Sequence, residues 1–185
     1  SSQSESDFDN IAIFNADTRF IDSHCVESCL DLLDSNDDIG VVGPLQYDSQ
    51  GRITHAGIFG SNEEPFHRAW LSRDLKAHRY IADCVTVSGS AYFIKRSAWD
   101  ELAQCPTYRE SDPHSSGAFL NTRLYHEETW CSYHARAHGY RVVYNGEAEM
   151  IHEHDSSPNP EKDIKIAESK LQFVAACQHH EIEHN

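Results

Sequence analysis

Two acidic segments and one histidine carry the residue types in this chain that point most directly to chemistry. The pair Glu127-Glu128 opens a predicted helix that ends at Gly139, and a β-branched strand follows the glycine. His152 stands just past that strand, and Asn15-Ala16-Asp17 ends an earlier apolar run. Because strand ends gather at one edge of an α/β sheet, we expect these side chains to lie together. Two carboxylates and an imidazole at one place can hold a divalent cation and a diphosphate.

Length and composition narrow the class of protein. The chain has 185 residues, 39% hydrophobic and 10% aromatic, which predicts one globular domain with a real core. Its formal charge of −15, from 30 acidic and 15 basic residues, repels phosphate backbones and argues against nucleic-acid binding. An anionic ligand would therefore need a local cation or a helix N-terminus. No apolar run is long enough to span a membrane, and no signal peptide is visible.

The six cysteines show no C-x-x-C spacing, and several fall inside apolar patterns. Disulfide frameworks favour shorter secreted chains, so we interpret these residues as reduced thiols in a cytoplasmic protein. They are Cys25, Cys29, Cys84, Cys105, Cys131 and Cys177.

Hydrophobic patterns predict strands that alternate with helices, as in an α/β sheet. The expected strands cover residues 11–14, 39–43, 53–59, 84–94 and 140–144, and the expected helices cover about 24–33, 97–103, 128–138 and a segment from about 160. Pro44 is expected to end the strand at 39–43. Gly89 lies within the strand expected at 84–94, where a glycine usually indicates a bulge or the close approach of a ligand. Residues 104–121 lack periodicity and are expected to form a long loop. The last helix is expected to bury Ile164, Ala167, Leu171 and Val174.

Five segments stand in a particular order between residues 10 and 156. They are Asn15-Ala16-Asp17-Thr18, Gly40-Val41-Val42-Gly43-Pro44, the stretch from Asp48 through Gly51-Arg52-Ile53 to His55-Ala56-Gly57, the run from Val87 to Arg96, and Glu127-Glu128 followed by His152. Together they resemble the inverting family-2 glycosyltransferases of the GT-A fold. Asn15-Ala16-Asp17-Thr18 is similar to the metal-binding D-x-D signature of that family, and Glu127-Glu128 falls where the family has a Glu-Asp pair.

The resemblance implies a GT-A-like, Rossmann-related mixed sheet flanked by helices. It also implies that most of the usual N-terminal nucleotide-binding half is lacking, because few residues precede Asn15. We divide the chain into a polar tail at residues 1–9, the transferase-like domain at 10–156, and a helix and tail at 157–185. A partner chain or a second copy is expected to complete the sheet beside residues 11–14, since an open edge exposes unpaired backbone groups.

The resemblance also implies an activity, which is transfer of a sugar from a UDP- or GDP-sugar to an acceptor hydroxyl on a glycan or another molecule. Asp17 and His152 are the candidate ligands of Mn²⁺ or Mg²⁺, which would neutralise the leaving diphosphate. Glu128 is the candidate general base, and Glu127 would orient a sugar hydroxyl or the helix. Residues that would contact substrate are Asn15, Gly89, Ser90, Trp70 and Trp130. A tryptophan more often belongs to the core, so either of the two could lie there instead.

Other functions stay open from the residues alone. The chain could be a non-catalytic carbohydrate-binding or assembly module derived from a transferase, or an unrelated metal-dependent hydrolase on an α/β sheet. His134 and His138 have a metal-like i, i+4 spacing without an H-E-x-x-H motif, and His179, His180 and His184 lie near the C-terminus.

Overall fold

The computed structural model describes residues 8–62, 64–104, 117–153 and 159–179. Most of the loop expected at 104–121 lies outside these ranges, as do His180, His184 and Cys105. The other five cysteines are buried free thiols in the described residues.

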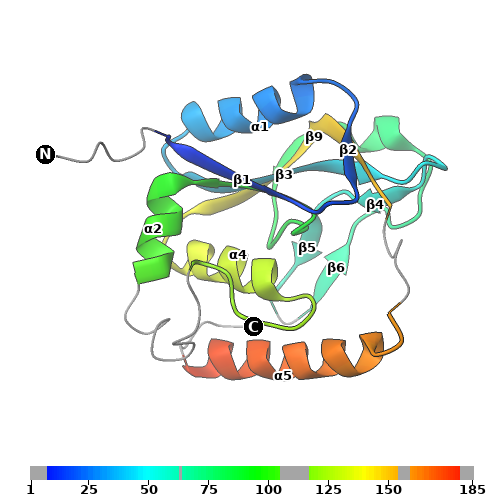
Figure 1. Cartoon of the computed structure of the whole chain (residues 1–185). Helices are drawn as coiled ribbons and strands as arrows, with labels where there is room; N and C mark the ends of the chain where they lie inside the picture. The colour runs from blue at the N-terminus through cyan, green and yellow to red at the C-terminus, as the bar shows by residue number, and fades with distance from the viewer. Residues whose placement is uncertain (1–7, 63, 105–116, 154–158, 180–185) are drawn as a thin grey trace, which may run out of the picture.

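A seven-stranded mixed sheet forms the centre of the protein (Figure 1). Its main path runs β1-β8-β3-β9-β2, with β4 added beside β3 and β7 beside β9. Strands β3 and β9 are parallel, whereas β8 runs antiparallel to both β1 and β3. The expected mixed α/β sheet is confirmed. The strands are β1 (Asn10–Phe14), β2 (Thr18–Phe20), β3 (Ile39–Tyr47), β4 (Ile53–His55), β7 (Ile81–Asp83), β8 (Ala91–Lys95) and β9 (Arg141–His152); β5 (Ile58–Gly60) and β6 (Pro65–His67) form a separate hairpin.

Helices cover both faces of the sheet (Figure 1). Helix α1 (His24–Asp34) packs on one face, where Leu33 meets Phe93 and Val143 in a buried cluster. Helices α2 (Arg96–Gln104) and α4 (Glu127–Ala137) cover the other face, around a cluster that contains Leu102 and Val142. Helix α5 (Lys162–His179) lies outside α4, and a short 3₁₀ helix, η1 (Leu75–His78), precedes β7. Within the described part of the chain, no helix combines the length and apolarity needed to cross a bilayer.

Three expected strands have different boundaries in the structure. Pro44 does not end β3, because the register with β9 shifts between Pro44 and Leu45, and this irregularity accommodates a residue without an N–H. The strand expected at 53–59 divides into β4 and β5 at Gly57, whose φ of +81° interrupts the extended backbone. Of the strand expected at 84–94, only the last part is a strand, which is β8; β7 ends just before this segment. Gly89 therefore lies in a turn rather than within a strand.

The last helix buries a different face from the one expected. Ile164 is 62% exposed and Leu171 is 72% exposed, whereas Phe173 and Cys177 are buried. The ring of Phe173 packs against Tyr133 of α4, with 5.6 Å between ring centroids. Apolar residues occur on two faces of this helix, so the packing partner selected the face, and the expectation for Ile164, Ala167 and Leu171 was wrong.

Candidate active site

Four chain segments that are distant in sequence meet at one edge of the sheet. Strand β8 is antiparallel to β1, with Ala91 opposite Phe14, so the turn before β8 lies beside the segment that follows β1. The backbone N–H of Asn15 donates to the carbonyl of Ser90, at 3.1 Å. Strand β2 then pairs with the end of β9, with Thr18 opposite His152. The N-terminal turn of α4 reaches the same edge, as the contact between Gly89 and Glu128 shows.

Asp17 and His152 are the two expected metal ligands, and the structure brings them together. Oδ1 of Asp17 lies 3.5 Å from Nε2 of His152, and the His152 side chain is only 9% exposed. A carboxylate oxygen and an imidazole nitrogen this close suit one shared Mn²⁺ or Mg²⁺ ion, which usually takes few protein ligands and completes its shell with phosphate oxygens and water. Among the described residues, no group of three or more metal-ligating side chains is placed to hold a metal ion.

Gly89 allows the backbone of its turn to approach Glu128 closely. A Cβ placed on Gly89 would lie 3.3 Å from both Cγ and Cδ of Glu128. The turn itself is held by short polar contacts: the hydroxyls of Ser88 and Ser90 lie 2.7 Å apart, and Ser90 Oγ donates to Gln46 Oε1 at 2.6 Å. This turn therefore forms a fixed wall beside the carboxyl group.

Glu128 is the most strongly perturbed carboxyl group of this edge. Its Oε2 atom is buried and has no hydrogen-bond partner in the described structure. Burial raises the pKa of Glu128 to about 8, with a further contribution from the negative charge of Glu127, while backbone amides that include those of Gly89 and Thr129 oppose the shift. A carboxyl group with a pKa near the working pH can both accept and release a proton there.

Glu127 lies beside Glu128 in the first turn of α4. Its Oε2 accepts a hydrogen bond from Thr122 Oγ1 at 3.2 Å, which ties the preceding segment to the helix. Before it, Tyr125 and His126 both adopt left-handed backbone conformations, with φ of +63° and +72°. The chain thus turns sharply before α4, and the His126 ring stacks on Phe173 of α5, with 5.2 Å between centroids.

The two tryptophans proposed to contact sugar lie in different environments. Trp130 is fully buried in the cluster with Val85, Tyr133 and Phe173, so it cannot present its ring to a ligand, and that expectation is corrected. Trp70 is 41% exposed, and its ring centroid lies 5.3 Å from that of His67. The environment of Trp70 is thus compatible with stacking on a sugar.

Sequence reasoning missed two residues of this edge, Gln46 and His55. They are paired across β3 and β4, both are buried, and both contact the turn at Ser88–Ser90. His55 left a signal in the sequence, because it is a polar side chain inside the strand expected at residues 53–59. Gln46 left none, because it lies past Pro44, where the second strand was expected to end.

His134 and His138 belong to a different network at the C-terminal end of α4. Their Nε2 atoms lie 3.1 Å apart, and Nδ1 of His138 lies 2.9 Å from Oε1 of Glu101. Glu101 and His134 contact different ring nitrogens of His138. In the part of the chain that the structure describes, no group of three or more metal-ligating side chains is placed to hold a metal ion at this pair.

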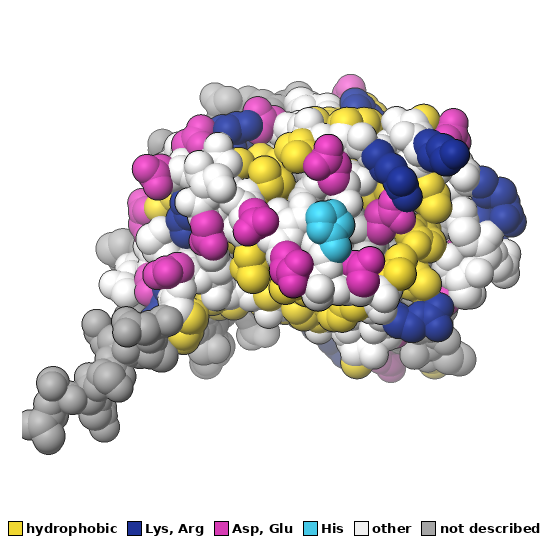
Figure 2. Space-filling model, turned by 90° about the horizontal axis from the view of Figure 1, so that it is seen from above, with side chains coloured by type: hydrophobic (Ala, Val, Ile, Leu, Met, Phe, Trp, Pro, Cys, Tyr) yellow, Lys and Arg dark blue, Asp and Glu magenta, His cyan; other side chains and the backbone are white. Residues whose placement is uncertain are grey.

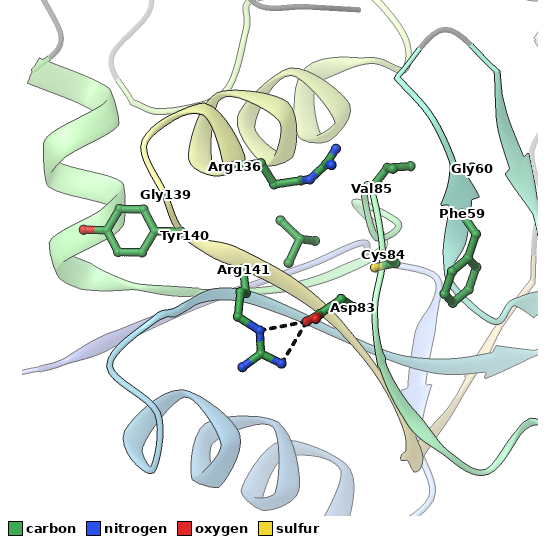
Figure 3. Close-up of a pocket in the computed structure, with 10 residues that line it drawn as sticks. Phe59, Gly60, Asp83, Cys84, Val85, Arg136, Gly139, Tyr140 and Arg141 are labelled. Atoms are coloured by element: carbon green, nitrogen blue, oxygen red, sulfur yellow. Dashed lines mark hydrogen bonds and ion pairs between the residues drawn. The ribbon is translucent and has the colours of Figure 1, made fainter. Parts of the chain in front are cut away.

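A cavity of about 420 Å³ lies at the opposite end of α4 and β9 (Figure 3). Its charged groups already have partners: Arg141 pairs with Asp83 at 2.9 Å and Arg136 donates to Asn62 Oδ1 at 2.6 Å. The cavity lies far along both elements from Glu128 and His152, which stand at their other ends. The cavity is therefore separate from the sheet edge where the candidate residues gather.

Acidic side chains are prominent on the face that carries α1 (Figure 2). Helix α1 contributes exposed Glu27, Asp31 and Asp34 to the surface, in keeping with the charge of −15 for the chain. An anionic ligand is repelled by such a surface, so its binding would need a local positive charge.

The mixed sheet flanked by helices is consistent with a GT-A-like fold. A family model described as glycosyl transferase family group 2 matches residues 10–177. The chain therefore belongs to this family of glycosyltransferases. No curated protein matches the chain closely enough to be named as a relative.

Proposed function

We propose that this glycosyltransferase moves a sugar from a UDP- or GDP-sugar to an acceptor hydroxyl with inversion at the anomeric carbon. Glu128 is the general base, and Asp17 and His152 hold a divalent cation. Asn15, Gly89 and Ser90 border the donor, Glu127 orients a sugar hydroxyl, and Trp70 stacks on a sugar ring. Family membership favours the transferase over the hydrolase and over the non-catalytic module.

The proposed reaction exchanges one bond at the anomeric carbon for another. The acceptor oxygen attacks that carbon from the face opposite the diphosphate, the bond to the diphosphate oxygen breaks, and its electron pair leaves with the nucleoside diphosphate. The carboxylate of Glu128 takes the proton from the acceptor hydroxyl. A bound Mn²⁺ or Mg²⁺ supplies charge neutralisation to the leaving diphosphate.

The observation that carries the proposal is the carboxyl group of Glu128. It combines a buried, unpartnered oxygen with a pKa raised to about 8, and it lies against a turn that also contacts the Asn15 backbone. An acidic residue that only stabilised the first turn of a helix would gain from exposure and a normal pKa.

A transfer assay tests the proposal directly. The protein is incubated with Mn²⁺ and a panel of UDP- and GDP-sugars, and release of nucleoside diphosphate is measured with and without mono- and oligosaccharide acceptors. We expect release in the wild type and a loss of at least about 100-fold in Glu128→Gln. The matched control is Glu161→Gln, an exposed carboxylate near α5 that pairs with Lys165.

Product stereochemistry separates the mechanisms. Proton NMR of the fresh product reports the anomeric configuration, and inversion is expected. Retention, or full activity in Glu128→Gln, would contradict the assignment of Glu128 as the base of an inverting enzyme.

The outer side of strand β1 provides a place where a further protein segment could pair. Strand β1 ends the strand path and, in the described residues, pairs only with β8. A partner chain or a second copy that adds a strand beside β1 would satisfy the outer backbone groups. Sedimentation velocity across a range of concentrations tests this: a species that stays monomeric at all concentrations contradicts a second copy.

A further inference from the structure

The turn at residues 88–90 contacts two separate parts of the candidate active site. The carbonyl of Ser90 accepts a hydrogen bond from the Asn15 N–H, at 3.1 Å, just before Asp17. Gly89, in the middle of the turn, lies against the carboxyl group of Glu128. The conformation of this turn therefore affects both the acidic segment after β1 and the proposed base.

Two buried side chains from neighbouring strands support the turn from beneath. Gln46 and His55 are directly opposite each other in the β3–β4 pair, and they are 0% and 1% exposed. Gln46 Oε1 accepts from Ser90 Oγ at 2.6 Å, and Nε2 of His55 accepts from the backbone N–H of Ser88 at 3.4 Å. The last contact is long, and it is the one that ties the first residue of the turn to β4.

The protonation state of His55 follows from that contact. An imidazole nitrogen accepts a hydrogen bond only when it carries no proton, so the proton of a neutral ring resides on Nδ1. Burial, with smaller contributions from His67 and His152, lowers the pKa of His55 to about 3. The ring therefore stays neutral, and Nε2 stays an acceptor, throughout the physiological pH range.

Packing alone does not account for a histidine at this position. Nδ1 of His55 is buried and has no hydrogen-bond partner in the described structure. A buried donor without a partner destabilises the folded state, and an aliphatic side chain would fill β4 without that penalty. The compensating interaction that the structure shows is the hydrogen bond from Ser88.

We propose that His55 is a positioning residue for the transfer reaction, whose imidazole holds the turn at 88–90 against the carboxyl group of Glu128. The proposal rests on the proposed function for the role of Glu128, but the contact itself can be tested without substrate. Loss of the hydrogen-bond acceptor would release Ser88, let the turn relax, and admit water to the carboxyl group.

The titration of Glu128 gives a readout that a merely structural role for His55 would not change. The pKa of Glu128 is measured by carboxyl ¹³C NMR in the wild type, His55→Leu and His55→Gln, with Glu128→Gln used to assign the signal. The other titratable groups that face Glu128 are Glu127, Cys131 and Tyr92. Burial raises the pKa of Cys131 to about 12 and that of Tyr92 well above its usual value, so neither titrates near pH 8.

The three variants have distinct expected results. We expect the pKa of Glu128 to fall by at least about one unit in His55→Leu, because a hydrated carboxyl group ionises more easily. His55→Gln retains a side-chain acceptor and should restore most of the wild-type pKa. His138→Gln, a histidine change at the far end of α4, should leave it unchanged. In the transfer assay, His55→Leu should lower kcat about 10- to 100-fold with little change in donor KM.

Several outcomes would overturn the proposal. One is a folded His55→Leu protein, with an unchanged circular dichroism spectrum, whose Glu128 pKa equals that of the wild type. A normal pKa for Glu128 in the wild type would also overturn the proposal, because it would mean that the turn does not keep water away from the carboxyl group. If His55→Leu fails to fold, His55→Met replaces it, since methionine fills irregular space without providing an imidazole acceptor. Full transfer activity in Glu128→Gln would instead contradict the proposed function. The comparison of the Glu128 pKa between the wild type and the His55 variants would still test the contact between His55 and the turn.

Discussion

Asp17 and His152 lie 3.5 Å apart, Oδ1 to Nε2, although one follows the first strand of the chain and the other ends the last. The three-residue strand β2 creates this proximity, because it folds back from the Asp17 turn and pairs Thr18 with His152. The Thr18 hydroxyl donates to the carbonyl of Asn15 at 2.7 Å and closes that turn. A short strand and one hydrogen bond thus create the proposed cation site.

Replacing Asp17 should remove metal-dependent nucleotide binding. Asp17→Ala deletes the only carboxylate of the proposed pair, so affinity for UDP or GDP in the presence of Mn²⁺ should fall at least about 10-fold, or about 1.4 kcal/mol. Titration calorimetry with and without Mn²⁺ measures this. Asp163→Asn in α5 is the control and should bind as the wild type does. Equal metal-dependent affinity in Asp17→Ala would place the cation elsewhere.

The rate of transfer should rise with pH up to about 8. A general base acts in its ionised form, and the pKa of Glu128 is raised to about 8. Below that value, the ionised fraction falls about tenfold for each pH unit, so kcat at pH 6 should be about 100-fold below its plateau. A pH profile at saturating donor and acceptor provides the test. A profile that is flat between pH 6 and 9 would exclude proton transfer to Glu128 as a rate-limiting feature.

The same pKa shift should make the wild type less stable as pH rises. Glu128 ionises near 4.5 in the unfolded chain and near 8 in the folded protein, so the folded state holds the extra proton between these values. Stability from this group is complete below about pH 4.5 and is lost as the pH rises toward 8. Glu128→Gln, which never ionises, should exceed the wild type in free energy of unfolding at pH 8 by at least about 1.4 kcal/mol. Urea unfolding at pH 5 and pH 8 measures the difference, with Glu161→Gln as the control that should show none.

Gly89→Ala should impair catalysis more than stability. Its Cβ would press on Cγ and Cδ of Glu128 from 3.3 Å and displace the carboxyl group, so kcat should fall about 10- to 100-fold. Gly51→Ala is the matched control, because Gly51 has a φ of +72° and no atoms within 4 Å of the new Cβ. That variant should lose about 1 kcal/mol of stability through backbone strain and keep its activity. If both variants have wild-type activity, the close approach at Gly89 has no catalytic role.

Trp70 and Trp130 should respond in opposite ways to truncation. Trp70→Ala removes a side chain that is 41% exposed, so we expect little loss of stability and a rise in the KM of the acceptor or donor of about 10-fold. Trp130→Ala leaves a cavity at a fully buried site and should lower the free energy of unfolding by about 3–5 kcal/mol. Thermal unfolding and substrate titrations measure both effects. An unchanged KM for both substrates in Trp70→Ala would remove Trp70 from the binding site.

Local sequence patterns predicted the elements that have strong local signals. The apolar run before Asn15 is β1, and the periodic segment after Ser23 is α1. Gly139, with a φ of +89°, follows the end of α4 as expected for a helix terminated by glycine. Each of these depends on residues close together in the chain.

Patterns that depend on distant partners were predicted poorly. The continuation of β3 past Pro44 depends on a register shift against β9, and the buried face of α5 depends on Tyr133 of α4. Nothing near Leu171 in the sequence indicates that α4 packs against the other side of α5.

The sequence by itself determined the class of residues available for chemistry: carboxylates, a histidine and a glycine at the ends of predicted elements, in the order found in a glycosyltransferase family. Only the tertiary structure decided which of them meet. It buried Trp130 in the core, and it brought His55 and Gln46 beneath the turn that faces Glu128. The physical reason is that burial and proximity result from the packing of strands and helices far apart in the chain, and a perturbed pKa such as that of Glu128 exists only once that packing has excluded water.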